Sequence, residues 1–351
     1  MKMKLLFSYI FLLFSPVVIA RGAIANLQQP YNVSGIIPAV FVFGDSVVDT
    51  GNNNWIATLA KGNFPQYGKN FEGGKATGRV CDGKVPSDLF VEELGIKELL
   101  PPYLDPTLQP KDLITGVNFA SIGSGYDPQT LAFLSALSIP KQLELFKEYI
   151  EKLKAIVGEA RALEIVSNSL IIVLTGNNDI QLNPASSLNP SYEDILVNFA
   201  TTFLQDLYKL GARRIGVFGV TALGCAPLHR NTQGGIQRNC VDSLNTKAYS
   251  FNNKLSIQIN YLDNKFPDAR IVYIDFYNFL LDLVNNPTKY GYKIVKNGCC
   301  ALAGIIDLPS CPIACSNDYD YIFWDLFHLT ERTYRLLVHQ VLQQHLQTFI
   351  S

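Results

Sequence analysis

Three clusters of polar residues in this sequence contain the side chains that nucleophilic catalysis requires. The triplet GDS (44–46) follows an apolar run, GNND (176–179) follows another, and DLFH (325–328) precedes a helical pattern. A serine hydroxyl becomes an effective nucleophile only when a base within hydrogen-bond reach can take its proton. An aspartate three residues before a histidine can orient the imidazole and leave its other nitrogen free to face such a serine.

Each cluster taken alone also has a purely structural interpretation. A serine after Gly-Asp is commonly part of a turn with a local hydrogen bond, and a histidine before a helix is commonly a cap. A run of asparagine and aspartate is usually a solvated loop. The order of the clusters along the chain, and the elements that position them, support the catalytic interpretation over the structural one.

Short apolar runs, rich in β-branched and aromatic residues, predict strands that are buried on both faces. They lie at 39–46, 116–121, 170–179, 214–220 and 269–276. Apolar residues at spacings of three and four predict helices over 142–157, 192–210, 242–266 and 330–349. Gly211 and Pro267 are stop signals for two of these helices, and Thr330 is a candidate N-cap for the last one.

This alternation of strands and helices predicts an α/β fold with a parallel sheet and right-handed crossovers. A single domain is expected, since no Pro/Gly/Ser-rich linker separates the strands. Functional groups in such folds gather at the carboxyl edge of the sheet. The clusters that directly follow predicted strands are therefore expected to lie there.

Taken together and in order, these segments resemble the plant GDSL esterase/lipase group, a part of the wider SGNH hydrolases. The signature blocks are FVFGDSVVDTGNNN, VNFASIGSGYD, TGNND and DLFHLTE, and the intervening ATGRVCDGKVPSDLFVEELGI and the later NGCC also match. The resemblance runs from about Pro38 to the last helix, so one hydrolase domain is expected over 38–351. It implies a flavodoxin-like three-layer α/β/α fold with a five-stranded parallel sheet, and ester hydrolysis without a metal or another cofactor.

Carried over block by block, the resemblance makes Ser46 the nucleophile, His328 its base and Asp325 the acid that orients the base. The oxyanion hole would consist of the Ser46 N–H, the Gly123 N–H and the side-chain amide of Asn178. Each such donor typically contributes about 10²–10³ in rate, because it faces the charge that develops in the transition state.

The sequence departs from the family pattern at three positions. Val47 stands where the first block usually has leucine, Ile122 where the second has glycine, and Leu329 where the last has proline. Ile122 adds a branched side chain beside a backbone donor, and Leu329 loses a fixed φ near the base, yet neither removes a catalytic group. Gly125 is close enough to Gly123 to be an alternative as the second-block donor.

The N-terminus has the layout of a secretory signal peptide. Lysines at positions 2 and 4 precede the apolar run LLFSYIFLLFSPVVIA, and Val18 and Ala20 fit positions −3 and −1 of a cleavage site. The alternative is an uncleaved membrane anchor, although the run is interrupted and short for a full span. We expect residues 1–20 to be removed and the mature chain to be secreted without a membrane span. The triplet NVS marks Asn32 as a glycosylation acceptor.

Seven cysteines meet an oxidising environment if the chain is secreted, which makes disulfides the default. Cys225 and Cys240 enclose a short polar loop, and we predict that they form a bridge. Because the count is odd, one thiol is left over, and Cys81 is the candidate.

The remaining cysteines lie close together near the C-terminus. Cys311 and Cys315 are each expected to pair with one of Cys299 and Cys300, with the connectivity left open. A zinc site is the alternative, but adjacent cysteines are awkward as two ligands of one tetrahedral ion.

The composition of the chain limits the kinds of molecule that it is expected to bind. Hydrophobic residues make up 48% of the chain and charged residues 17%, with a formal net charge of −1, so no basic excess points to nucleic acid. We expect a small-molecule, lipid or cell-wall ester as substrate, with Trp55, Phe64, Tyr67 and Phe71 as candidate pocket walls. The predicted function is a secreted serine ester hydrolase that works through an acyl-enzyme on Ser46. The alternatives are an acyltransferase that uses the same acyl-enzyme and a catalytically silent binding module.

Overall fold

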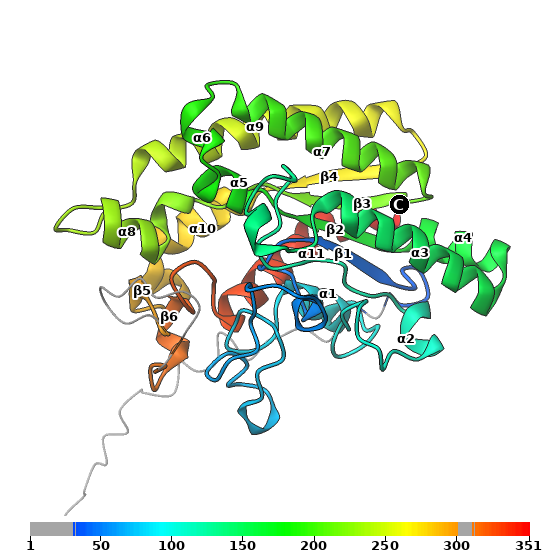
Figure 1. The fold of residues 1–351 in the computed structure, drawn as a ribbon, viewed down its shortest axis with the longest axis horizontal. Helices are drawn as coiled ribbons and strands as arrows, with labels where there is room; N and C mark the ends of the chain where they lie inside the picture. Colours follow the sequence, from blue (N-terminus) through cyan, green and yellow to red (C-terminus); the bar gives the residue numbers. More distant parts are fainter. Residues whose placement is uncertain (1–30, 32, 301–310, 312) are drawn as a thin grey trace, which may run out of the picture.

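A parallel sheet of four strands forms the centre of the fold (Figure 1). The computed structural model describes residue 31, residues 33–300, residue 311 and residues 313–351. The strands lie side by side in the order β1 (Val40–Gly44), β2 (Leu170–Leu174), β3 (Arg214–Phe218) and β4 (Arg270–Ile274). Every pair is parallel, so all carboxyl ends meet at one edge of the sheet.

Alternate residues of the strands face two different layers of helices, because side chains in a strand point to opposite faces. Phe41, Phe43 and Val173 pack against α3 (Ile139–Val157), α4 (Glu159–Asn168), α7 (Tyr192–Lys209) and α9 (Asp242–Lys265). Val42 and Ile172 pack against α1 (Pro86–Glu93), α10 (Phe276–Asn285) and α11 (Glu331–Ile350). The result is a three-layer α/β/α fold, as the family resemblance implies.

Shorter helices and turns connect this framework. The short α-helices are α2 (Pro110–Ile114), α5 (Asn177–Leu182), α6 (Ala185–Leu188) and α8 (Pro227–Gln233). The 3₁₀ turns are η1 (Asn52–Trp55), η2 (Glu72–Gly74), η3 (Ala132–Leu134), η4 (Leu223–Cys225), η5 (Pro287–Tyr290) and η6 (Asp318–Asp320). A separate small sheet pairs β5 (Ile294–Gly298) with β6 (Tyr321–Phe323) in parallel.

The prediction of a fifth strand in the central sheet is wrong. Residues 116–121 run beside β1 and donate two hydrogen bonds to it, from Phe119 N to Val42 O and from Ser121 N to Gly44 O. The ladder is interrupted because the Gly44 N–H, which a continuous strand pair would use, donates to Gln142 Oε1 at 2.9 Å. Only an isolated bridge remains at Val42 and Asn118, so the sheet has four strands.

The predicted long helices are present, and Thr330 caps the last one by accepting a hydrogen bond from Thr333 N. After β1, a turn leads into η1. The predicted signal peptide and the glycosylation acceptor Asn32 lie outside the described residues. Across the described ranges, no helix is both long enough and apolar enough to cross a membrane.

Three disulfides join six of the seven cysteines. The bridges are Cys225–Cys240, Cys299–Cys315 and Cys300–Cys311. The Cα atoms of the joined residues are 4.3, 5.0 and 5.4 Å apart. Cys81 is buried and free. The structure therefore confirms the predicted bridges and settles the pairing that the sequence left open.

Candidate active site

The turn after β1 presents Ser46 at the carboxyl edge of the sheet. Asp45 N donates to Leu174 O at 3.1 Å, which ties the turn to β2, and Val48 N and Asp49 N both donate to Asp45 O. Gly44 has φ of +147°, and a Cβ there would collide with the Leu174 carbonyl. Glycine is therefore required immediately before the Asp-Ser pair.

Ser46, His328 and Asp325 form a continuous chain of contacts in the structure. Ser46 Oγ lies 2.7 Å from His328 Nε2. The other ring nitrogen, Nδ1, lies 2.8 Å from Asp325 Oδ2 and 3.0 Å from Oδ1. Residues 282 positions apart thus meet with a serine, an imidazole and a carboxylate in the order that general-base activation needs.

The segment 325–328 is held by its own backbone and by the small sheet. Phe327 N and His328 N donate to Asp325 Oδ1 at 2.8 and 2.7 Å, and Trp324 N donates to His328 O at 2.7 Å. Gly298 at the end of β5 packs so tightly on the backbone of Asp325 that a Cβ would collide with it. The ring orientation of His328 is therefore set by a rigid local loop.

Electrostatics favours a charged Asp325 beside a basic His328. Burial alone would raise the pKa of Asp325, but the charge of His328 and hydrogen bonds from His328 and Phe327 hold it below its ordinary value. Burial alone would lower the pKa of His328, yet the carboxylate of Asp325 and the charge of Asp45 raise it above its ordinary value. The carboxylate thus stabilises the imidazolium that forms when His328 takes a proton.

The predicted oxyanion-hole residues line the same cavity as Ser46. Among the described residues, neither the Ser46 N–H nor the Gly123 N–H donates to a protein acceptor. The Asn178 side-chain amide sits in the first turn of α5 and donates to Ser124 O at 2.9 Å, which fixes its orientation. Donors that are free and preorganised suit a developing oxyanion.

Gly123 and Gly125 differ clearly in their surroundings. Gly123 lines the cavity and has φ of +89°, a backbone conformation that favours glycine. Gly125 instead packs on the carboxylate of Asp179, which accepts hydrogen bonds from Tyr126 N and Asp127 N. Of the two glycines, Gly123 has the position that a donor to the reacting centre would need.

Polar residues of the first block, to which the sequence gave no role, hold the loop that contains Gly123. Asn52 Nδ2 donates to Ala120 O at 2.8 Å, and Asn53 Nδ2 donates to Ile122 O at 3.1 Å. The Ile122 N–H in turn donates to Asp49 Oδ2 at 3.1 Å. The GNNN motif after Ser46 therefore holds the second block in place. Its unusual run of asparagines was the signal in the sequence that could have revealed this role.

Gln142 is a second positioning residue that the sequence did not reveal. Its fully buried amide accepts from Gly44 N and donates to Gly44 O, both at 2.9 Å, just before the turn that holds Ser46. It also donates to Ser124 Oγ at 3.1 Å. A lone glutamine near the start of α3 has no local pattern that separates it from a surface residue.

A largely apolar cavity of about 510 Å³ opens beside Ser46. Its apolar lining comprises Val47, Leu59, Ala60, Val80, Ile122, Leu131, Leu134, Leu182, Leu223, Ala226, Phe276, Leu280, Phe323, Phe327 and Leu329. Of the aromatic residues expected as walls, only Tyr67 lines this cavity, whereas Trp55 is 48% exposed. The cavity suits an apolar group joined to the reacting carbonyl.

Asp45 is buried next to Ser46 but takes no part in the chain of contacts. Its Oδ1 accepts from Val47 N at 3.0 Å, and its Oδ2 has no hydrogen-bond partner in the described structure. Burial is the main cause that raises the pKa of Asp45 to about 7.

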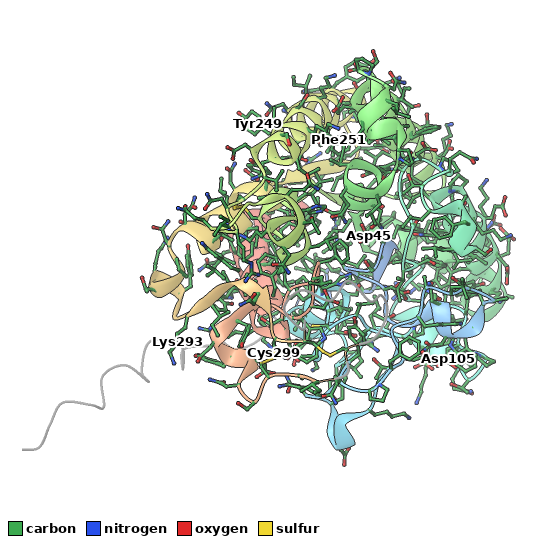
Figure 2. The ribbon with its side chains drawn as sticks, turned by 60° about the vertical axis from the view of Figure 1, so that its left-hand side comes forward. Asp45, Asp105, Tyr249, Phe251, Lys293 and Cys299 are labelled. Carbon is green, nitrogen blue, oxygen red and sulfur yellow. A yellow bond between two sulfur atoms is a disulfide. The ribbon has the colours of Figure 1, made fainter. Side chains whose placement is uncertain are left out.

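Figure 2 shows Asp45 in the interior of the molecule and Cys299 in the C-terminal region. In the part of the chain that the structure describes, no cluster of three or more His, Cys, Asp or Glu could hold a metal ion.

The fold and this site define the class of serine hydrolases with a three-layer α/β/α architecture. The profile of GDSL-like lipases and acylhydrolases matches residues 40–341. The chain is 44% identical over 326 residues to GDSL esterase/lipase EXL3 of Arabidopsis thaliana, covering 90% of this chain and 89% of the relative. It is also 44% identical over 333 residues to GDSL esterase/lipase At5g42170 of the same plant, covering 93% and 90%. The chain belongs to the GDSL-like lipase/acylhydrolase family.

Proposed function

We propose that this protein hydrolyses carboxylic esters through an acyl-enzyme on Ser46. The observation that supports the proposal most directly is the contact chain from Ser46 Oγ through His328 to Asp325 at the wall of an apolar cavity. The names of the relatives, which describe esterases and lipases, agree with it.

The geometry suggests how each residue acts. His328 Nε2 takes the proton of the Ser46 hydroxyl as the oxygen attacks the ester carbonyl carbon. The carbonyl oxygen becomes an oxyanion that faces the N–H groups of Ser46 and Gly123 and the amide of Asn178. His328 then gives the proton to the leaving alcohol, and a water molecule repeats the attack to release the acid.

The cavity favours esters with an apolar acyl chain over acetyl esters of polysaccharides. Its lining is mostly aliphatic and aromatic, and burying one CH₂ group contributes about 0.8 kcal/mol. Each methylene that still finds room should therefore raise kcat/KM by a few fold. A series of p-nitrophenyl esters of increasing chain length, beside acetylated polysaccharide, measures this preference. The proposed preference fails if acetyl esters are the best substrates.

Replacement of the nucleophile tests the proposed chemistry. Ser46→Ala should leave folding intact and reduce ester hydrolysis to near background, because no other group can form the acyl-enzyme. Ser169→Ala is the control, since Ser169 is a buried serine that donates to Ile165 O just before β2, away from the cavity. The proposal is wrong if Ser46→Ala keeps more than about a tenth of the wild-type rate.

We also propose that the protein is secreted. The leader-like N-terminus and three disulfides support this, because disulfides form and persist outside the reducing cytosol. Expression of the full chain in a eukaryotic secretion host should yield protein in the medium whose first residue is Arg21. Retention in the cell with residues 1–20 intact would contradict the proposal.

A further inference from the structure

The Asp325 carboxylate receives hydrogen bonds from its own loop and from one distant side chain. Phe327 N, His328 N and the His328 ring are all within three residues of it. The distant partner is Tyr67, whose hydroxyl donates to Asp325 Oδ2 at 2.9 Å across 258 residues of sequence. This is the same carboxylate oxygen that lies 2.8 Å from His328 Nδ1.

Tyr67 is itself held firmly in place. It is 7% exposed, and its ring packs edge-on against Trp324, with centroids 6.5 Å apart. The next residue, Gly68, donates from its backbone N–H to Cys81 O at 2.8 Å and has φ of +71°, which favours glycine. Since Trp324 directly precedes Asp325, both the ring and the hydroxyl of Tyr67 contact the segment that contains the predicted triad acid.

We propose that Tyr67 is a positioning residue of the triad. Its hydroxyl fixes the rotation of the Asp325 carboxylate, and the negative charge of that carboxylate is then shared between Tyr67 and His328. This inference rests on the proposed function of Ser46, His328 and Asp325. Oδ1 is already held by two backbone N–H groups, so the Tyr67 hydroxyl completes the arrangement at Oδ2. A carboxylate with a second donor at Oδ2 attracts the imidazole proton less strongly.

The hydroxyl of Tyr67 stays a donor over the whole working pH range. Burial, followed by the charge of Asp325, raises the pKa of Tyr67 well above its ordinary value. Other titratable groups near the triad in the described structure are Cys81, Tyr334 and Asp45, and Lys61 lines the same cavity. Burial raises the pKa values of Cys81 and Tyr334 well above their ordinary values, so both stay neutral, and it raises that of Asp45 to about 7. Asp45 is therefore the one of these three that titrates in the range of His328.

Tyr67→Phe separates this role from that of a cavity wall, because the ring that lines the cavity remains. We expect kcat to fall about tenfold with KM changed less than about twofold, since a hydrogen bond to a charged group is lost. The acid limb of kcat/KM should move upward by roughly half to one pH unit, because the carboxylate then holds the His328 proton more tightly. An unchanged kcat and an unchanged acid limb would overturn the proposal.

Two comparisons make the test specific. Tyr149→Phe is the matched control, since Tyr149 is also buried and donates at 2.7 Å to Leu113 O, away from the site; its pH profile should match that of wild type. In an Asp325→Ala background, Tyr67→Phe should change kcat less than about twofold, because no carboxylate is left to position. A full tenfold loss in that background would show that Tyr67 acts by another route.

A measurement without turnover keeps this inference separate from the proposed function. The His328 ring can be titrated by NMR in two proteins, Ser46→Ala and the double variant Ser46→Ala/Tyr67→Phe, both of which keep Asp45. The pKa of His328 should be higher in the double variant. An unshifted His328 pKa would overturn the role of Tyr67 even if Ser46→Ala abolishes activity. Full activity of Ser46→Ala would instead overturn the proposed function.

Discussion

Two regions of the molecule hold the two halves of the candidate site in different ways. Ser46 follows β1, a strand that is fully buried and paired along its length with β2, and Asn178 lies in the first turn of the helix after β2. Asp325 and His328 follow β6, which pairs with β5 in a small two-stranded sheet. That small sheet lies next to two disulfides, with Cys299 N donating to Phe323 O at 3.0 Å.

The comparison shows which forces position each half. The nucleophile half depends on a hydrophobic core with helices on both faces of the sheet, which is spread over many residues. The acid–base half also packs into the core through Ile322, Phe323 and Leu329. Its loop is held in addition by a few local contacts: two disulfides, the Asp325 hydrogen bonds and the Trp324 backbone. Single changes in the second half should therefore affect catalysis through geometry, and four measurements can test this difference.

The largest effect is expected at the acid. Asp325→Asn should lower kcat about 10⁴-fold without unfolding the protein, since an amide favours the wrong imidazole tautomer. Asp45→Asn is the matched control: it should cost much less activity, because no hydrogen bond joins Asp45 to His328 and an amide oxygen can still accept from Val47 N. Kinetics and thermal melts of both variants decide between the two carboxylates. A greater loss for Asp45→Asn at unchanged melting temperature would reverse the assignment.

The next effect tests the nucleophile half. Asn178→Ala should lower kcat by about 10²–10³ with KM little changed, because the amide is expected to act on the transition state. Asn177→Ala provides a neighbouring control, since the Asn177 amide oxygen accepts from Thr221 N at 3.1 Å. Steady-state kinetics with one short and one long ester gives both constants. Equal losses for the two asparagines would argue against a specific role of Asn178.

The pH dependence tests the coupling of the two halves. His328 must be neutral to accept the Ser46 proton, and its pKa is raised above the ordinary 6.5 by Asp325 and Asp45 despite burial. Activity should therefore decline as pH falls through a midpoint above 6.5, by about tenfold per pH unit below it. Asp45→Asn should move the midpoint slightly downward. A wild-type midpoint near pH 5 would show that another group controls this limb.

The smallest effect on activity is expected from removal of a disulfide. Cys299→Ala/Cys315→Ala should lower the free energy of unfolding by about 3 kcal/mol and kcat several fold, because β5 and β6 lose a cross-link. Cys225→Ala/Cys240→Ala removes the cross-link that closes a loop of similar length. It should lower the free energy of unfolding by a similar amount but cause a smaller loss of activity. Denaturant melts and kinetics of both double variants give the comparison. A larger activity loss for the second pair would contradict the contrast between the two halves.

The sequence by itself predicted each of the four strands of the central sheet, and its resemblance to a known family named the principal residues of the candidate site. Each strand is a short apolar run, and runs such as 170–174 predict burial on both faces without knowledge of their neighbours. The resemblance of the signature blocks to the GDSL family likewise implied that Ser46, Asn178 and His328 belong together, and the structure brings them to one cavity. The Cys225–Cys240 bridge followed from a short loop between the two cysteines.

The tertiary structure alone decided what depends on contacts between distant segments. Residues 116–121 have the composition of a strand, yet the amide of Gln142 takes the Gly44 N–H that would have continued the ladder. The hydroxyl of Tyr67 reaches Asp325 only because the loop before α1 and the segment after β6 pack together. Periodicity reports the local environment of a segment, whereas a single side-chain hydrogen bond between remote residues depends on the packing of the whole chain.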